Sequence, residues 1–241
     1  MPSSTPCIIA IPARFGSSRL PGKPLQLLGG EALIRHVARR ALACDPLAVV
    51  IATDDARVAA AVYDMPVRVC MTAESHVSGS DRLAECARQC AWSDDAIIVN
   101  LQGDEPFAPV SGITAVVDAL QADAAPMATL ATPITSMEAL FDPACVKVVC
   151  DVHQHAMYFS RAPMPWARAA MAKSRRHLPP AEVPVLRHIG MYAYRAGFLQ
   201  RFTQLPPTPL EMAESLEQLR ALEHGFAIAV RLAPEPFPAG I

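Results

Sequence analysis

The sequence predicts an α/β fold, a doubly wound sheet of mostly parallel strands with a smaller mixed-sheet extension. In the first half of the chain, short apolar runs rich in β-branched residues alternate with segments whose apolar residues recur at helical spacing. Beyond residue 126, strand-like runs follow one another with few helical patterns between them. The change favours an antiparallel or mixed sheet in that part of the chain.

The alternating half supplies the predicted parallel core. The expected strands are Cys7–Ile11, Ala48–Thr53, Val67–Met71 and Ala96–Leu101. The helices expected between them are Leu33–Cys44, Asp55–Tyr63 and Asp81–Ala91. Strands that are apolar on both faces need helices on both sides, and such sheets bind ligands outside the carboxyl ends of their strands. We therefore expect a site where the loops after the first, third and fourth strands meet.

The second half is expected to extend this sheet within one domain, residues 1–241. Its predicted strands are Met127–Ile134, Val146–Asp151, Ala156–Ser160 and His188–Tyr194. The proline-rich, basic stretch 163–184 has weak periodicity and is interpreted as a long mobile loop near a site or an interface. Residues 210–225 predict one amphipathic helix, with Leu216, Leu219 and Leu222 facing inward and Gly225 ending it.

Composition excludes several partners. The net charge is −2 and the isoelectric point is near 6.4, so no global attraction to nucleic acid or to anionic membranes is expected. No apolar run approaches the length of a membrane span, and the N-terminus does not resemble a signal peptide, which predicts a cytoplasmic protein. The seven cysteines are interpreted as small core residues in a reducing compartment; Cys86 and Cys90 share a helix face but lack a zinc-knuckle partner.

The segment IPARFGSSRLPGKPL, residues 11–25, carries the strongest chemical signal. Arg14, Arg19 and Lys23 are spaced along a loop that its prolines and glycines keep from forming a helix or a strand. Backbone N–H groups at glycines approach phosphate oxygens closely, and the three cations offset phosphate charge. Lysine is scarce, with three against 18 arginines, which sets Lys23 apart. The loop predicts polyphosphate binding; a solvated basic surface loop is the alternative.

Two further segments follow predicted strands. QGDEP, residues 102–106, places Asp104 at the carboxyl end of a uniformly apolar strand, where an α/β enzyme holds a hard divalent cation; a turn-capping role is the alternative. In SGSDR, residues 78–82, Ser80 suits the N-cap of the following helix and Asp81 suits its first turn. Arg82 is mildly unfavourable at that helix end, which indicates that it serves a ligand.

Six segments, in this order, resemble one known family. They are IPARFGSSRLPGKPL, HVSGSDRLAEC, IIVNLQGDEP, YFSRAPMPW, LRHIGMYAYR and LEMAESLEQLRAL. They closely resemble the 3-deoxy-manno-octulosonate cytidylyltransferases, the CMP-KDO synthetases of bacterial lipopolysaccharide biosynthesis, over essentially the whole chain. The resemblance implies a Rossmann-like nucleotidyltransferase sheet and a Mg²⁺-dependent reaction in which CTP and KDO give CMP-KDO and pyrophosphate. It also implies a homodimer.

The resemblance assigns roles residue by residue. By similarity, Arg14 and Lys23 hold the triphosphate and Arg19 is a weaker candidate, Asp104 binds Mg²⁺, and Ser80, Arg82 and Gln102 recognise cytosine and ribose. The positions that match the sugar-acid pocket are Arg161, His188, Tyr192, Glu217 and Gln218, within or beside a lobe of roughly residues 127–200 that also offers a dimer surface. Residue chemistry agrees, since a guanidinium pairs with a carboxylate and the other side chains can bind hydroxyls.

Alternatives stay open at this point. His188, Tyr192 and Glu217 are each compatible with ordinary packing or solvation, and Lys147 within VKVV has no assignment. The family continues after a Pro-x-Gly turn into a helix with a second metal-binding Asp, whereas this sequence stops at Ile241. Two expectations stay open: the sequence is cut short of the natural one, or the metal site is incomplete. Other readings are a cytidylyltransferase for 8-amino-KDO or sialic acid, and a nucleotide-binding protein without turnover. A dinucleotide oxidoreductase is disfavoured because no GxGxxG follows a predicted strand.

Overall fold

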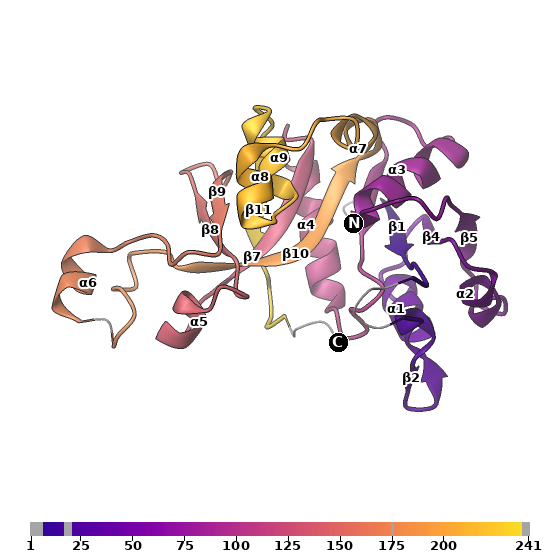
Figure 1. The fold of residues 1–241 in the computed structure, drawn as a ribbon, viewed down its shortest axis with the longest axis horizontal. Helices are drawn as coiled ribbons and strands as arrows, with labels where there is room; N and C mark the ends of the chain where they lie inside the picture. Colours follow the sequence, from indigo (N-terminus) through magenta and orange to yellow (C-terminus); the bar gives the residue numbers. More distant parts are fainter. Residues whose placement is uncertain (1–6, 17–20, 175, 238–241) are drawn as a thin grey trace, which may run out of the picture.

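A central sheet organises the chain, whose computed structural model describes residues 7–16, 21–174 and 176–237. Within these residues the sheet has nine strands, and its main path runs β11-β7-β10-β6-β1-β4-β5 (Figure 1). The strands of this path are β1 (Cys7–Pro12), β4 (Ala48–Thr53), β5 (Arg68–Met71), β6 (Ile97–Asn100), β7 (Met127–Pro133), β10 (Leu186–Arg195) and β11 (Ile228–Leu232). The predicted α/β class with a mixed extension is confirmed.

Strand β1 lies at the point where the strand order reverses. It pairs in parallel with β4 on one side and with β6 on the other, so the chain winds outward in both directions from it. Ala10 is the register partner of Val50 in β4 and of Asn100 in β6. Strand β10 is antiparallel to both β6 and β7, while β11 is parallel to β7. Ligands in such sheets bind at this reversal, outside the carboxyl ends of the strands.

Helices cover both faces of the sheet. One face carries α1 (Leu33–Leu42), α2 (Ala56–Ala61) and α4 (Val110–Gln121). The other face carries α3 (Gly79–Gln89), α7 (Ala196–Phe202) and the pair α8 (Pro209–Glu214) and α9 (Gln218–Glu223). Alternation along β1 supplies both cores, since Ile9 and Ile11 pack into the first and Ile8 and Ala10 into the second. In the described part of the chain, no helix is long and apolar enough to cross a membrane.

A smaller lobe projects from this body, at the left of Figure 1. It contains β8 (Lys147–Cys150), β9 (Ala156–Ser160), α5 (Met137–Phe141) and α6 (Arg168–Lys173). Strand β8 joins the sheet by pairing with the first residues of β10, and β9 pairs with β8. The lobe has a core of its own, made of Ile134, Leu140, Met171 and Val185. Strands β7 and β10 belong to the central sheet.

Three expectations about elements need correction. The single helix predicted for residues 210–225 is two helices, because Ser215 adopts a left-handed conformation with φ 51° and ψ 52°. Stretch 163–184 is not only a loop, since α6 forms within it and buries Met171. The sequence prediction also lacks the helices α4, α5 and α7, strand β11, the one-turn 3₁₀ helix Lys23–Leu25 and the hairpin β2 (Leu27–Leu28) and β3 (Glu31–Ala32).

Candidate active site

The loop after β1 and the turn after β6 meet directly. These strands are neighbours, so their carboxyl ends place Pro12 beside the QGDEP turn. A Cβ atom on Gly103 would lie 2.9 Å from the Pro12 carbonyl oxygen. Glycine is therefore required at this position, because any side chain would push the turn away from the loop. Two of the segments singled out in the sequence thus form one surface.

Lys23 and Asp104 join across this contact. Gly22, at φ 71°, donates its N–H to the Phe15 carbonyl at 2.9 Å, which folds the loop back before the one-turn helix that begins at Lys23. The Lys23 Nζ then lies 2.6 Å from Asp104 Oδ2. These side chains are 26% and 41% exposed, so both remain accessible to a ligand. Arg14, on the same loop, is exposed, and Arg19 lies outside the described residues.

The acidic neighbour Glu105 was not singled out from the sequence. One of its oxygens, Oε2, is buried and has no hydrogen-bond partner among the described residues. Burial, with a smaller contribution from Asp104, raises the pKa of Glu105 to about 7. The turn therefore presents one accessible carboxylate, Asp104, and one half-buried carboxyl with an unpartnered oxygen, Glu105. The two adjacent acidic residues in QGDEP are the sequence signal that could have identified Glu105.

The start of α3 differs from the expectation. Ser78, rather than Ser80, is the N-cap: its hydroxyl accepts the Asp81 N–H at 3.0 Å and the Asp81 carboxylate accepts the Ser78 N–H. This capping box begins the helix one residue before Ser80. Ser80 is buried, and its hydroxyl donates to Glu217 Oε2 at 2.8 Å, across 137 positions of sequence. A predicted nucleotide residue therefore contacts a predicted sugar residue.

Arg82 is committed to partners inside the protein. It is 2% exposed, and it donates to Asp54 Oδ2 at 2.8 Å and to the Thr72 hydroxyl. Asp54, at the carboxyl end of β4, also accepts the Phe15 N–H at 3.1 Å. The buried pair explains why a cation stands at this helix start, so its position alone does not indicate a ligand; a role of Arg82 in nucleotide binding stays a prediction. Asp54 was missed, although it follows a predicted strand as the other site segments do.

Gln102 lies between the nucleotide segments. Its amide nitrogen donates to the Asn100 side chain at 3.1 Å, and its Oε1 lies 3.8 Å from the Cβ position of Gly79 at the start of α3. The residue is half-buried. It therefore lies between the end of β6 and the start of the helix that carries Ser80.

Aromatic rings line the β10 side of the site. His188 contacts the Phe159 ring edge-on at 4.9 Å and the Tyr192 ring at 5.5 Å, and Tyr192 stacks on Tyr194 at 5.8 Å. Burial lowers the pKa of His188 to about 3, so its imidazole is neutral, and Nε2 lies 3.0 Å from the Thr129 hydroxyl. Burial also raises the pKa of Tyr192 well above its usual value. Both residues can therefore act as neutral hydrogen-bonding groups.

Arg161, at the end of β9, is held in place by backbone carbonyls. Its Nε donates to the Glu214 carbonyl at 2.7 Å and its Nη1 to the Pro143 carbonyl at 2.9 Å. Lys147, which the sequence left unassigned, is buried, and its Nζ donates to the Arg161 and Asp142 carbonyls at 2.7 and 2.9 Å. Lys147 thus fixes the backbone at Arg161. A guanidinium has five N–H donors, so Arg161 keeps further donors for a ligand.

The break between α8 and α9 places the remaining candidates. Arg161 donates to the carbonyls at residues 214 and 215, where the backbone turns. The next helix begins at Gln218, with Glu217 as its N-cap. Burial raises the pKa of Glu217, and the Ser80 hydrogen bond opposes this effect. Gln218 is 6% exposed, and its Nε2 has no partner in the described part of the chain. This buried amide is a donor for an incoming oxygen.

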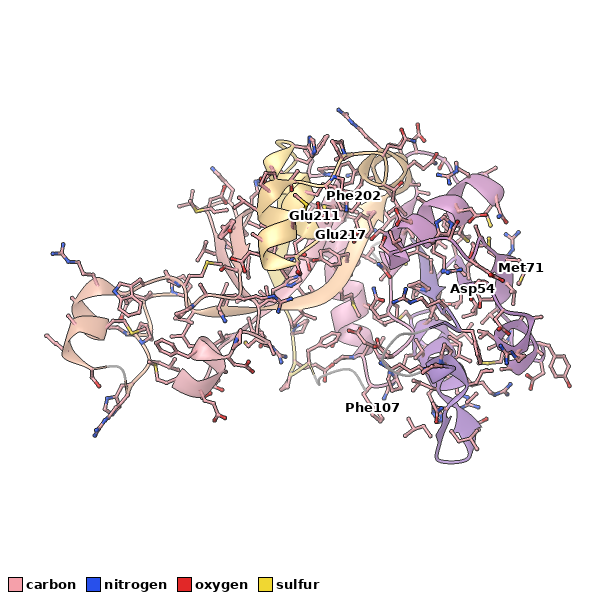
Figure 2. The ribbon with its side chains drawn as sticks, viewed as in Figure 1. Asp54, Met71, Phe107, Phe202, Glu211 and Glu217 are labelled. Carbon is pink, nitrogen blue, oxygen red and sulfur yellow. The ribbon has the colours of Figure 1, made fainter. Side chains whose placement is uncertain are left out.

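The predicted residues therefore form two adjoining groups. The first group lies around the ends of β1 and β6 and contains Lys23, Asp104, Gln102 and Ser80. Asp54 adjoins it through its contacts with Phe15 and Arg82. The second group lies along β10 and at the start of α9 and contains His188, Tyr192, Glu217 and Gln218. Arg161 adjoins it by donating to the carbonyls of residues 214 and 215. Figure 2 shows Asp54 on the β4 side and Glu217 on the α9 side of the molecule. The Ser80–Glu217 hydrogen bond connects the two groups.

Comparisons with known proteins identify the family of the chain. Residues 8–228 match the family described as cytidylyltransferase. A 3-deoxy-manno-octulosonate cytidylyltransferase of Stenotrophomonas maltophilia (strain K279a) is 59% identical over 238 residues, 98% of this chain and 92% of the relative. A protein of the same name from Xanthomonas axonopodis pv. citri (strain 306) is 57% identical over 244 residues, which cover 100% of this chain and 94% of the relative.

Solved structures give the same result. A CMP:2-keto-3-deoxy-manno-octonic acid synthetase complexed with CTP superposes with a TM-score of 0.87 at 40% identity, covering 98% of this chain and 93% of the other. A 4-diphosphocytidyl-2C-methyl-D-erythritol synthase superposes with a TM-score of 0.62 at 12% identity, covering 99% and 94%. This second likeness is one of fold alone.

Proposed function

Because the chain belongs to the 3-deoxy-manno-octulosonate cytidylyltransferase family, we propose that this nucleotidyltransferase moves the CMP group of CTP to KDO and releases pyrophosphate. The observation that carries the proposal is the joined site: the Lys23–Asp104 pair on the phosphate side and the Ser80–Glu217 hydrogen bond toward the sugar side. The product would supply KDO for lipopolysaccharide biosynthesis. The expected cytoplasmic location and homodimer belong to the same proposal.

The nucleotide would bind where β1 and β6 end. Arg14 and Lys23, with Arg19, would hold the triphosphate, and Lys23 would exchange its Asp104 partner for phosphate oxygens. Ser80 and Gln102 would recognise the base and the ribose. Arg82 would position these residues. Together with Asp54 it links the start of α3 to the loop at Phe15, so that both segments keep their relative position.

A divalent cation fits the donors of this site. Asp104 offers an accessible carboxylate, and Mg²⁺ is commonly held by one or two carboxylates together with substrate phosphates. Asp104 would therefore hold Mg²⁺ in this proposal. When bound, the ion supplies charge neutralisation at the reacting phosphate.

The sugar acid would bind along β10 and α9. Arg161 would pair with the KDO carboxylate, for which a planar guanidinium is well suited. The neutral His188 and Tyr192 and the unpartnered amide of Gln218 would bind hydroxyls. Glu217 would link the sugar side of the site to the nucleotide side through its hydrogen bond with Ser80.

The transfer would be an in-line displacement. The anomeric 2-hydroxyl of KDO would form a bond to the α-phosphorus of CTP while the bond from that phosphorus to pyrophosphate breaks, and the hydroxyl proton would leave to solvent. The cations of the β1 loop would stabilise charge on the departing pyrophosphate, which is where such contacts lower the barrier.

Pyrophosphate release tests the proposal against its nearest alternatives. The chain, with Mg²⁺, would be assayed with CTP, ATP, GTP and UTP, each combined with KDO, 8-amino-KDO or sialic acid. We expect release with CTP and KDO that requires both. Preference for another sugar acid would reassign the substrate, and nucleotide binding without release under any combination would contradict an enzymatic role.

A further inference from the structure

Three thiols that are separated in the sequence converge between β5 and α3. Cys70 lies on β5, Cys86 lies on α3 and Cys90 is the C-cap of that helix. Their Sγ atoms all lie within 4.8 Å of one another. Cys86 and Cys90 are one helical turn apart, which brings them to the same face of α3, and the β5 packing adds the third sulfur. This cluster lies outside the substrate site described above.

The spacing suits a thiophilic cation. Three sulfurs around one ion with bonds of about 2.3 Å lie about 4 Å apart, so the observed cluster needs only a small contraction. Soft cations such as Cu(I) and Cd(II) prefer thiolate ligands, and three thiolates on a rigid strand and helix define a trigonal face. Oxygen-preferring Mg²⁺ would not compete for such a set of ligands.

One member of the cluster is accessible from solvent. Cys86 is fully buried and Cys70 is nearly so, whereas Cys90 is half-buried and opens the cluster toward solvent. Gln89 Oε1 accepts a hydrogen bond from the Cys70 thiol at 3.3 Å, so an oxygen borders the site.

We propose that Cys70, Cys86 and Cys90 form a three-thiolate binding site for a soft, thiophilic metal cation. The three thiols lose their protons to solvent as the ion binds, and no oxidant or reductant takes part. The bound ion links β5 to the second half of α3. It therefore stabilises the edge of the sheet without occupying the start of α3, where the nucleotide is proposed to bind.

Cadmium titration tests this site in the intact, reduced protein. Cd²⁺ would be added with excess Mg²⁺ present to fill oxygen sites, while the sulfur-to-cadmium absorption band and the melting temperature are recorded. We expect one ion per chain and a higher melting temperature. Cys86→Ser should weaken binding by at least about tenfold and remove about a third of the band, because one of three thiolates is lost.

Two further variants separate the site from general thiol reactivity. Cys90→Ser changes the half-buried member, which is easier to accommodate should Cys86→Ser fold poorly, and it should weaken Cd²⁺ binding similarly. Cys150→Ser changes a half-buried thiol on β8 and should leave binding unchanged. Equal binding by all variants, equal loss in Cys150→Ser, or no sulfur-to-cadmium band in the wild type would overturn the proposal.

Discussion

Lys23 combines an accessible position with a defined partner. Its contact with Asp104 is partly exposed, and such pairs contribute about 0–1 kcal/mol to stability. We expect Lys23→Ala to lower kcat by about 10²-fold or more, because a contact to developing phosphate charge is lost, while the free energy of unfolding changes by less than about 1 kcal/mol. Lys173→Ala, at an exposed lysine of α6, is the control. A Lys23 variant that melts many degrees lower with normal specific activity would make this residue structural.

Arg161 is expected to be intolerant of a change that preserves its charge. Its guanidinium donates to carbonyls of two separate segments and would also meet the sugar carboxylate, whereas an ammonium is a point donor. Arg161→Lys should raise the KM for KDO at least about tenfold and leave the KM for CTP nearly unchanged. Steady-state kinetics with Arg201→Lys, at an exposed arginine, as control would show this. Unchanged kinetics for KDO would remove Arg161 from the site.

His188 makes stability depend on pH. Burial lowers its pKa to about 3 from an ordinary value of 6.5, so the unfolded chain binds a proton first as pH falls. The stabilisation is complete above pH 6.5 and is lost progressively from there toward pH 3, by at most about 1.4 kcal/mol per pH unit. Denaturant unfolding at pH 7.5, 6 and 5 should therefore show a smaller loss for His188→Gln than for the wild type. The same pH dependence in both proteins, with exposed His177→Gln as reference, would contradict this.

At the scale of elements, Asp54 connects β4, the β1 loop and α3. It accepts from the Phe15 N–H and pairs with the buried Arg82, whereas its neighbour Asp55 pairs with the exposed Arg57. We expect Asp54→Asn to destabilise the protein by about 3–5 kcal/mol, because it leaves a buried guanidinium without its charge partner, and to raise the KM for CTP. Asp55→Asn should change both quantities little. Urea unfolding and CTP kinetics of the two variants provide the measurement, and equal effects would argue against the proposed link.

Apolar periodicity in the sequence predicted helices and strands well where the tertiary packing follows the local pattern. The parallel strands and α1 to α3 lie where apolar periodicity places them, because burial on both faces of the sheet demands that pattern. The single helix expected for 210–225 fails for a tertiary reason: Arg161 binds the carbonyls of residues 214 and 215 at the break. Helix α4 was missed although its sequence carries an amphipathic signal: a polar stripe of Ser111, Thr114, Asp118 and Gln121 lies opposite a wide buried apolar face.

At the scale of the molecule, the sheet explains how much of the site the sequence could reveal. Loops at the carboxyl ends of neighbouring strands were expected to meet, and Lys23 and Asp104 do meet there. The Ser80–Glu217 contact spans 137 positions and depends on the α8–α9 break, so no local pattern could predict it. The cysteine cluster was likewise hidden, because Cys70 reaches Cys86 and Cys90 only through the packing of β5 on α3.

The central claim is that one joined site couples CTP to KDO, and phosphorus NMR of the reaction tests it most directly. With the chain, Mg²⁺, CTP and KDO, we predict a new phosphodiester signal of CMP-KDO and an equal amount of pyrophosphate. Without KDO neither should form, and Asp104→Asn should abolish both. CTP should be preferred over ATP by about 100-fold in kcat/KM, as expected for two lost hydrogen bonds. Pyrophosphate formed without KDO, or kcat/KM values for CTP and ATP within a few-fold, would contradict the account.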